Sequence, residues 1–176
     1  MAVKKVSEKK VSAKKNVKGC ELVIPVPQGG QALATFELTP LRPVAGKAQD
    51  WKLIDTSTGE TVTGISVSFH LKSSDVEREF ERAVLIVNLA KSVDNAEGYW
   101  RFVLNGVEPG QVTGDQNVDV VTEITNYGRT LIAYVHALDL GKSEIDYGYL
   151  ASFTDAISGV VSIYESRDPD IVVKRP

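Results

Sequence analysis

The sequence GISVSFHLK at residues 64–72 decides the fold, because apolar and polar residues alternate along it without a break. Ile65, Val67, Phe69 and Leu71 occupy every second position. Side chains of a β-strand point to opposite faces in turn, so this pattern predicts a strand with one buried face and one wet face. We expect the apolar row to pack against a second sheet and the intervening polar residues to face solvent.

Other segments of strand character follow at intervals of roughly 8 to 14 residues, separated by Gly, Pro, Asn and Asp. This spacing is typical of antiparallel all-β folds. It predicts one domain over residues 20–176, a single antiparallel β-sandwich of about ten strands, immunoglobulin-like or jelly-roll-like. The expected strands are 20–26, 31–38, 51–55, 64–72, 83–90, 99–104, 117–125, 129–137, 145–153, 159–165 and 170–173.

Local signals refine this scheme at a few positions. Residues 83–90 are continuously apolar, which predicts a central strand buried on both faces. Asn105-Gly106 and Pro109-Gly110 both predict turns. The best helical candidate is 74–81, with a cap at its start and an apolar side formed by Val76 and Phe80.

Composition places the chain among soluble globular proteins. It has 176 residues, of which 43% are hydrophobic and 24% charged, and no apolar run reaches the length of a membrane span. No apolar segment follows the basic N-terminal residues, so we expect no standard signal peptide and a cytoplasmic location, or export by a route that the sequence does not reveal. With Cys20, His70 and His136 as its only cysteine and histidines, the chain predicts no intrachain disulfide, no Cys/His metal cluster and no cofactor.

Charge is divided sharply along the chain. Residues 1–19 hold seven lysines and one glutamate, a net charge of +6, whereas the other residues hold 13 basic and 22 acidic groups, a net charge of −9. A five-residue repeat of lysine pairs cannot stay on one helical face, because each repeat turns a helix by roughly 140° beyond a full turn. Residues 1–19 are therefore expected to form a flexible basic arm. Its lysines are Lys4, Lys5, Lys9, Lys10, Lys14, Lys15 and Lys18.

Two interpretations of the arm stay open. Its charge density suits binding to nucleic acid or another polyanion, which would release counterions. The alternative is a solvated tail, or one that lies on the acidic body of the same or a neighbouring chain. The arm contains no arginine and no aromatic residue, so it lacks the stronger marks of specific nucleic-acid contact.

Gly141-Lys142-Ser143 resembles the end of a phosphate-binding loop. The motif requires a glycine five positions earlier, where this chain has His136, and a helix afterwards. Residues 145–153 alternate like a strand instead. We therefore expect a hairpin loop at this position.

A partial calcium-loop pattern begins at Asp115, which Asn117 and Asp119 follow at the required spacing. The sixth position is Val120 rather than glycine, and the twelfth is Asn126 rather than glutamate. The loop therefore lacks its sharp turn and its bidentate ligand. A surface turn that leads into a strand is the favoured interpretation.

No arrangement of residues predicts catalysis. Both histidines lie on expected strands, opposite an apolar face, and no nucleophile or orienting group can be assigned to either. Four carboxylates could pair in space, although their spacing does not show that they do. They are Asp146, Asp155, Asp168 and Asp170.

An aromatic stripe runs along the expected strand 145–153, where Tyr147, Tyr149 and Phe153 share one face. If exposed, the stripe could stack on sugars or bases, or bury against another subunit. The polar character of Asp146 and Ser152 favours the other interpretation, in which the stripe belongs to the core.

The C-terminal third resembles the DP-EP family of small bacterial β-sandwich proteins. The resemblance implies an immunoglobulin-like sandwich and no catalytic residues. The final segment, 173–176, lacks a second acidic-proline pair, which is a departure from the family pattern. The residues that carry the resemblance are 126–131 (NYGRTL), 147–149 (YGY), 155–159 (DAISG), 168–172 (DPDIV) and Pro176.

The leading functional hypothesis is a non-enzymatic structural or interaction module that forms homo-oligomers through its sheet edges and its basic arm. The alternative is a nucleic-acid-associated, coat-type protein that binds polyanions through the arm only. A third hypothesis is an enzyme or carbohydrate-binding module that uses the aromatic stripe.

Overall fold

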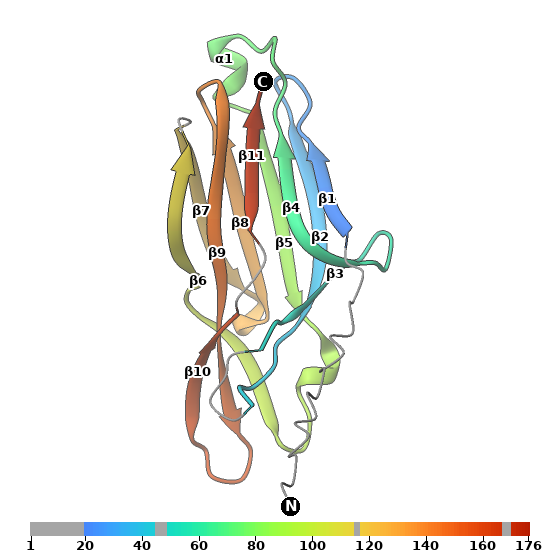
Figure 1. The fold of residues 1–176 in the computed structure, drawn as a ribbon. Helices are drawn as coiled ribbons and strands as arrows, with labels where there is room; N and C mark the ends of the chain where they lie inside the picture. Colours follow the sequence, from blue (N-terminus) through green and yellow to red (C-terminus); the bar gives the residue numbers. More distant parts are fainter. Residues whose placement is uncertain (1–19, 45–48, 115–116, 167–169) are drawn as a thin grey trace, which may run out of the picture.

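Figure 1 shows the computed structural model, which describes residues 20–44, 49–114, 117–166 and 170–176. The predicted basic arm and its lysines lie outside these residues. The described chain is all-β, and its strands run mostly along the long axis of the molecule (Figure 1). They are β1 (Cys20–Pro25), β2 (Gln31–Thr39), β3 (Lys52–Asp55), β4 (Thr61–Ser68), β5 (Arg82–Leu89), β6 (Gly98–Gly114), β7 (Val118–Thr125), β8 (Thr130–Ala137), β9 (Gly141–Asp155), β10 (Val161–Glu165) and β11 (Ile171–Arg175).

These strands form one hydrogen-bonded sheet that wraps around the core. Its order is β10-β9-β11-β4-β3-β2-β5-β8-β7, with β1 added beside β4 and β6 beside β9. Strands β6 and β7 lie next to each other at the ends of this path, where the Thr122 hydroxyl donates a 2.8 Å hydrogen bond to the Asn105 carbonyl. The sheet is thus a nearly closed, barrel-like structure.

The all-β prediction is confirmed, but the expected pair of separate sheets differs from the structure. Strand β3 pairs with β2 through residues 52–55 and with β4 through Leu53 and Ile54, so it joins the two halves. Three pairings are parallel rather than antiparallel: β1 with β4, β11 with β4, and β2 with β5. Sequence periodicity reports the faces of a strand and not the direction of its neighbour, so these pairings were not foreseen.

The alternating stretch at residues 64–72 forms the second half of β4 and the turn after it. Ile65, Val67 and Phe69 are buried as expected, but the strand ends at Ser68 and Leu71 is half exposed. The polar face is not entirely wet, because Ser66 is also buried. Strand β4 has β1 and β11 on its two sides, which places its middle deep inside the sheet.

Strand β6 is much longer than predicted, and the two expected turns lie within it. The pairing of β6 with β9 shifts register between Phe102 and Val107 and between Pro109 and Val112. The glycine-containing pairs at 105–106 and 109–110 therefore fall at irregularities of a continuous strand, which bend it without reversing it. The predicted hairpin loop at Gly141 is likewise the beginning of β9.

The predicted helix is reduced to one turn, α1 (Asp75–Arg78). Ser74 caps it as expected, and Glu77 completes a capping box. The supposed apolar side is not buried, because Val76 and Phe80 are both largely exposed. Two 3₁₀ turns, η1 (Lys91–Val93) and η2 (Asn126–Gly128), complete the described helical structure. None of these segments has the length and hydropathy of a membrane span.

Strand β11 ends near α1 (Figure 1), and its last residue, Arg175, forms a buried ion pair with Glu81. Arg175 Nη1 lies 2.6 Å from Glu81 Oε2, and neither side chain is exposed. Glu81 also accepts hydrogen bonds from the Gly29 amide, at 2.8 Å, and from the Ser73 hydroxyl. Burial raises the pKa of Glu81, but the hydrogen bonds from Ser73, Gly29 and Arg175 outweigh this effect and hold the pKa below its usual value.

Candidate strand-addition groove

Two strand edges are left open where β1 passes β2. Strand β1 pairs only with β4 among the described strands. Strand β2 pairs with β5 through residues 31–38 on one side, but with β3 only through residues 36–39 on the other. Residues 31–34 of β2 therefore have no paired strand on the side away from β5 in the described part of the chain. Unpaired edges of this kind are templates for the addition of a further strand.

The direction of the free backbone groups follows from the neighbouring hydrogen bonds. In β1, the Val26 amide donates to the Ser68 carbonyl of β4, at 2.8 Å. In a strand, the backbone groups of alternate residues point to opposite edges, so those of Glu21 and Val23 point away from β4. The backbone of Pro25 also points away from β4, so its missing N–H removes no hydrogen bond to that strand.

The same reasoning orients β2. The Gly30 carbonyl accepts from the Arg82 amide of β5, and the Thr35 carbonyl accepts from the Thr56 amide on the opposite side. The backbone groups of Gln31 and Leu33 therefore point away from β5 as well. Both open edges present backbone donors and acceptors to the space between β1 and β2.

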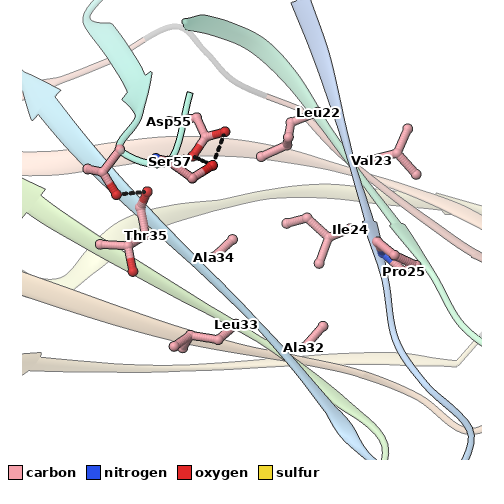
Figure 2. Close-up of a pocket in the computed structure, with 11 residues that line it drawn as sticks. Leu22, Val23, Ile24, Pro25, Ala32, Leu33, Ala34, Thr35, Asp55 and Ser57 are labelled. Carbon is pink, nitrogen blue, oxygen red and sulfur yellow. Dashed lines mark hydrogen bonds between the residues drawn. The ribbon is translucent and has the colours of Figure 1, made fainter. Parts of the chain in front are cut away.

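That space is a groove of about 370 Å³, which we call the β1–β2 groove (Figure 2). Its inner wall is apolar: Ile24 is buried, and Leu22, Ala32 and Ala34 are half-buried against the core. Figure 2 shows the side chains of β1 and β2 on either side of an open space. The lining residues are Leu22, Val23, Ile24, Pro25, Ala32, Leu33, Ala34, Thr35, Asp55, Thr56 and Ser57.

Two large apolar side chains stand on the outer rim of the groove. Val23 on β1 is 59% exposed and Leu33 on β2 is 68% exposed. Single exposed apolar residues are common on protein surfaces. Here they face solvent on both sides of an apolar groove with open backbone edges, which is the arrangement that a recognition site for an extended peptide requires.

Acidic groups lie at the end of the groove where β1 begins. Asp55 is the only charged residue among the described residues that line it. Burial raises the pKa of Asp55, but hydrogen bonds from Ser57 and Thr58 outweigh that effect and keep the pKa below its usual value. Glu60 is exposed nearby, and its carboxylate accepts from the Cys20 thiol across 3.5 Å. This end of the groove favours a positively charged ligand.

The predicted aromatic stripe is part of the core. Tyr147, Tyr149 and Phe153 are 3%, 1% and 6% exposed, so none of them can stack on a ligand at the surface. The two tyrosine rings pack edge to face, with centroids 5.4 Å apart, and Phe153 packs on Trp100. Burial raises the pKa of both tyrosines well above its usual value.

The histidines and the Asp155 carboxylate, considered as catalytic or metal-binding groups, each have a separate structural partner. His70 is exposed and its Nδ1 accepts from the Lys72 amide, whereas His136 Nε2 lies 2.8 Å from the Arg78 carbonyl. The Asp155 carboxylate holds the turn between β9 and β10 by accepting from the amides of residues 157 and 158. Asp115 and Asp168 lie outside the described residues, within which no group of three or more possible metal ligands is found.

A sequence model of the DP-EP family matches residues 18–175. The chain belongs to the DP-EP family. The match includes every described strand, whereas the resemblance seen in the sequence concerned only the C-terminal third. A search of curated proteins finds no match, and the DP-EP description names no activity, ligand or partner.

The motifs that suggested the DP-EP family are structural elements of this fold. Asn126 and Tyr127 both have positive φ angles, of 50° and 55°, in the tight turn between β7 and β8. Ile171 and Val172, from the motif at the C-terminal end, begin β11, which pairs with both β4 and β9. Neither motif lines the β1–β2 groove.

Sequence reasoning did not find the groove. It depends on which edges of β1 and β2 remain unpaired, and that follows from pairings with β3, β4 and β5. The prolines at positions 25 and 27 carry a local signal, because proline is confined to strand edges and ends.

Proposed function

We propose that this protein is a non-enzymatic interaction module that self-associates by taking an extended segment of a second copy into the β1–β2 groove. The observation that carries the proposal is the meeting of two open strand edges across an apolar groove. An added strand would complete the backbone hydrogen bonding of Glu21 and Val23 on one wall and of Gln31 and Leu33 on the other. It would also cover the half-buried side chains beneath.

We also propose how the barrel-like sheet relates to a two-sheet sandwich. The groove and the gap between β6 and β7 divide the barrel into two halves, and β3 crosses between them. We therefore treat the protein as an immunoglobulin-like sandwich whose two sheets are joined at one end. We also propose a cytoplasmic location.

The test is the mass of the protein in solution, measured by sedimentation equilibrium at low salt. We expect the natural chain to assemble and a variant with Val23→Lys and Leu33→Lys to be monomeric, because lysines on an edge oppose strand addition. Val121 and Ile163 are exposed to a similar degree on the edge strands β7 and β10. The matched control, Val121→Lys with Ile163→Lys, should assemble like the natural chain.

Two results would overturn this proposal. One is a natural chain that stays monomeric at every concentration tested. The other is a groove variant that assembles as well as its matched control. Circular dichroism of each variant establishes that a loss of assembly is not a loss of folding.

Association with nucleic acid through the lysines of residues 4–18 is the second candidate, and the net charge of +6 in residues 1–19 favours it. It predicts retardation of a DNA or RNA fragment in a gel at 50 mM salt, and loss of that retardation as salt rises. Absence of retardation at 50 mM salt would remove this candidate.

A further inference from the structure

We infer that residues 11–17 of a neighbouring copy (VSAKKNV) occupy the β1–β2 groove as an added strand, antiparallel to β1. This inference rests on the proposed function and names the segment that is bound. Four observations support it: the pattern of this segment, the fit of the groove, the distribution of charge, and the length of chain before β1.

The segment has the pattern of a strand with one apolar face. Val11, Ala13 and Val17 fall on odd positions, and Ser12, Lys14 and Asn16 fall on even ones. An added strand places alternate side chains inward, so the odd positions would face the core and the even ones would face solvent. Lys15 is the one inward position that is not apolar.

The groove matches such a strand in length. A strand rises about 3.3 Å per residue, so seven residues span roughly 23 Å, which is close to the length of the six-residue wall formed by β1. The opposite wall carries Ala32 and Ala34, whose small side chains leave room for Val11 and Ala13. Both walls offer free backbone groups, so the added strand would be hydrogen-bonded on its two edges.

Charge fixes the direction of the added strand. Asp55 lies at the end of the groove where β1 begins, and its amide donates to the carbonyl of the exposed Glu60. An arrangement antiparallel to β1 brings the C-terminal half of the segment, with Lys15 and the following Lys18, toward this acidic end. The opposite direction would bring Lys18 toward the start of β2, where Gln31 pairs with Arg82. Like charges close together would oppose that direction.

The connection to β1 favours a neighbouring copy over the same chain. Only Lys18 and Gly19 separate Val17 from Cys20, where β1 begins. The two-residue reversals that suit hairpins need a positive φ at both central residues, or glycine at the first. Lys18 would be the first central residue of such a reversal, and lysine is neither glycine nor a residue that readily adopts a positive φ. An exchange of segments between two copies avoids the reversal and gives a closed dimer with two equivalent contacts.

The experiment uses full-length chains that carry two substitutions in the segment. Val11→Asp with Ala13→Asp places charges on the inward face, and the matched control, Ser12→Asp with Asn16→Asp, makes the same change of charge on the outward face. We expect the inward variant to raise the dimer dissociation constant by roughly a hundredfold or more, because a carboxylate would be buried without a partner. We expect the control to shift it by about tenfold or less, through charge alone.

A mixing experiment completes the test. The groove variant, Val23→Lys with Leu33→Lys, retains a competent segment, and the inward variant retains a competent groove. Each alone should be monomeric, whereas an equimolar mixture should form a dimer held by one contact. Sedimentation of the mixture, with one chain fluorescently labelled, detects this dimer.

The outcomes separate this inference from the proposed function. If the inward variant still dimerises while the groove variant does not, another segment fills the groove, so this inference is wrong and the proposed function stands. If the groove variant dimerises normally, both are wrong. An outward control as weak as the inward variant, or a mixture that stays monomeric, also overturns the inference.

Discussion

Replacement of Glu81 by alanine should destabilise the fold more than any single change at the surface. The change removes one partner of an ion pair whose two side chains are both fully buried. The Arg175 guanidinium keeps its hydrogen bonds to the Ala137 carbonyl, at 2.8 and 3.2 Å, and to the His70 carbonyl, at 2.9 Å. Its charge would nevertheless be left in the interior without a counterion.

The expected loss is about 4 kcal/mol of unfolding free energy. Breaking a buried ion pair by removal of one partner costs about 3–5 kcal/mol. Part of this cost comes from the Gly29 amide and the Ser73 hydroxyl, which lose their acceptor and contribute about 1 kcal/mol each. For a chain of this length, a loss of about 4 kcal/mol lowers Tm by roughly 8–16 °C. Glu81→Gln should give a smaller loss, because it keeps an acceptor oxygen.

Urea unfolding followed by tryptophan fluorescence measures the effect, since Trp51 and Trp100 are both core residues. Asp75→Ala is a suitable control, because Asp75 is fully exposed and lies 3.6 Å from Arg78. We expect no measurable change from that control. A Glu81→Ala variant within about 1 kcal/mol of the natural chain would refute the reasoning, since it would mean that the buried guanidinium needs no counterion.

Two further predictions concern acid and glycine. The pKa values of Glu81 and Asp94 are lowered in the folded protein. Their contribution to stability is therefore complete above the pKa values of the unfolded chain, which are about 4. That contribution is lost as the pH falls through the lower pKa values of the folded protein. The urea midpoint should therefore decrease from about pH 5 downward, less steeply in Glu81→Gln, and a midpoint constant to pH 3 would contradict this. Gly59 and Gly106 share a φ of +76°, but a Cβ at Gly59 meets no atom within 4 Å, whereas one at Gly106 lies 2.4 Å from Leu131 Cδ1. Gly106→Ala should thus cost about 1–3 kcal/mol more than Gly59→Ala in urea unfolding, and equal losses would show that the buried leucine gives way freely.

Local periodicity was sufficient to predict the strands but not their neighbours. The alternation at Ile65, Val67 and Phe69 identified β4 and its buried face correctly, because the period of two is a property of the strand itself. The burial of Ser66 was missed, since it depends on β1 and β11, which come from the two ends of the described chain. The turn signal at Pro109-Gly110 failed for a similar reason. Pairing with β9 continues through it.

The candidate site shows the same limit more strongly. Nothing in the sequence near Val23 or Leu33 says that their backbone edges are unpaired, because that depends on how far β3 extends along β2. The buried pair of Glu81 and Arg175 was also missed, since it joins residues 94 positions apart in the sequence. Charged residues in a sequence are normally expected at the surface. Such features become visible only when long-range pairing is known.

In the proposed assembly, the open edges of β1 and β2 become paired. Amide hydrogen exchange at Val23 and Leu33 tests it most directly, because their N–H groups point into the groove. On passing from dilute, monomeric protein to assembled protein, exchange at these two amides should slow by about a hundredfold or more, while the amides of Leu22 and Ile24, which point toward β4, stay protected in both states. Assembly that leaves Val23 and Leu33 exchanging rapidly would contradict the account.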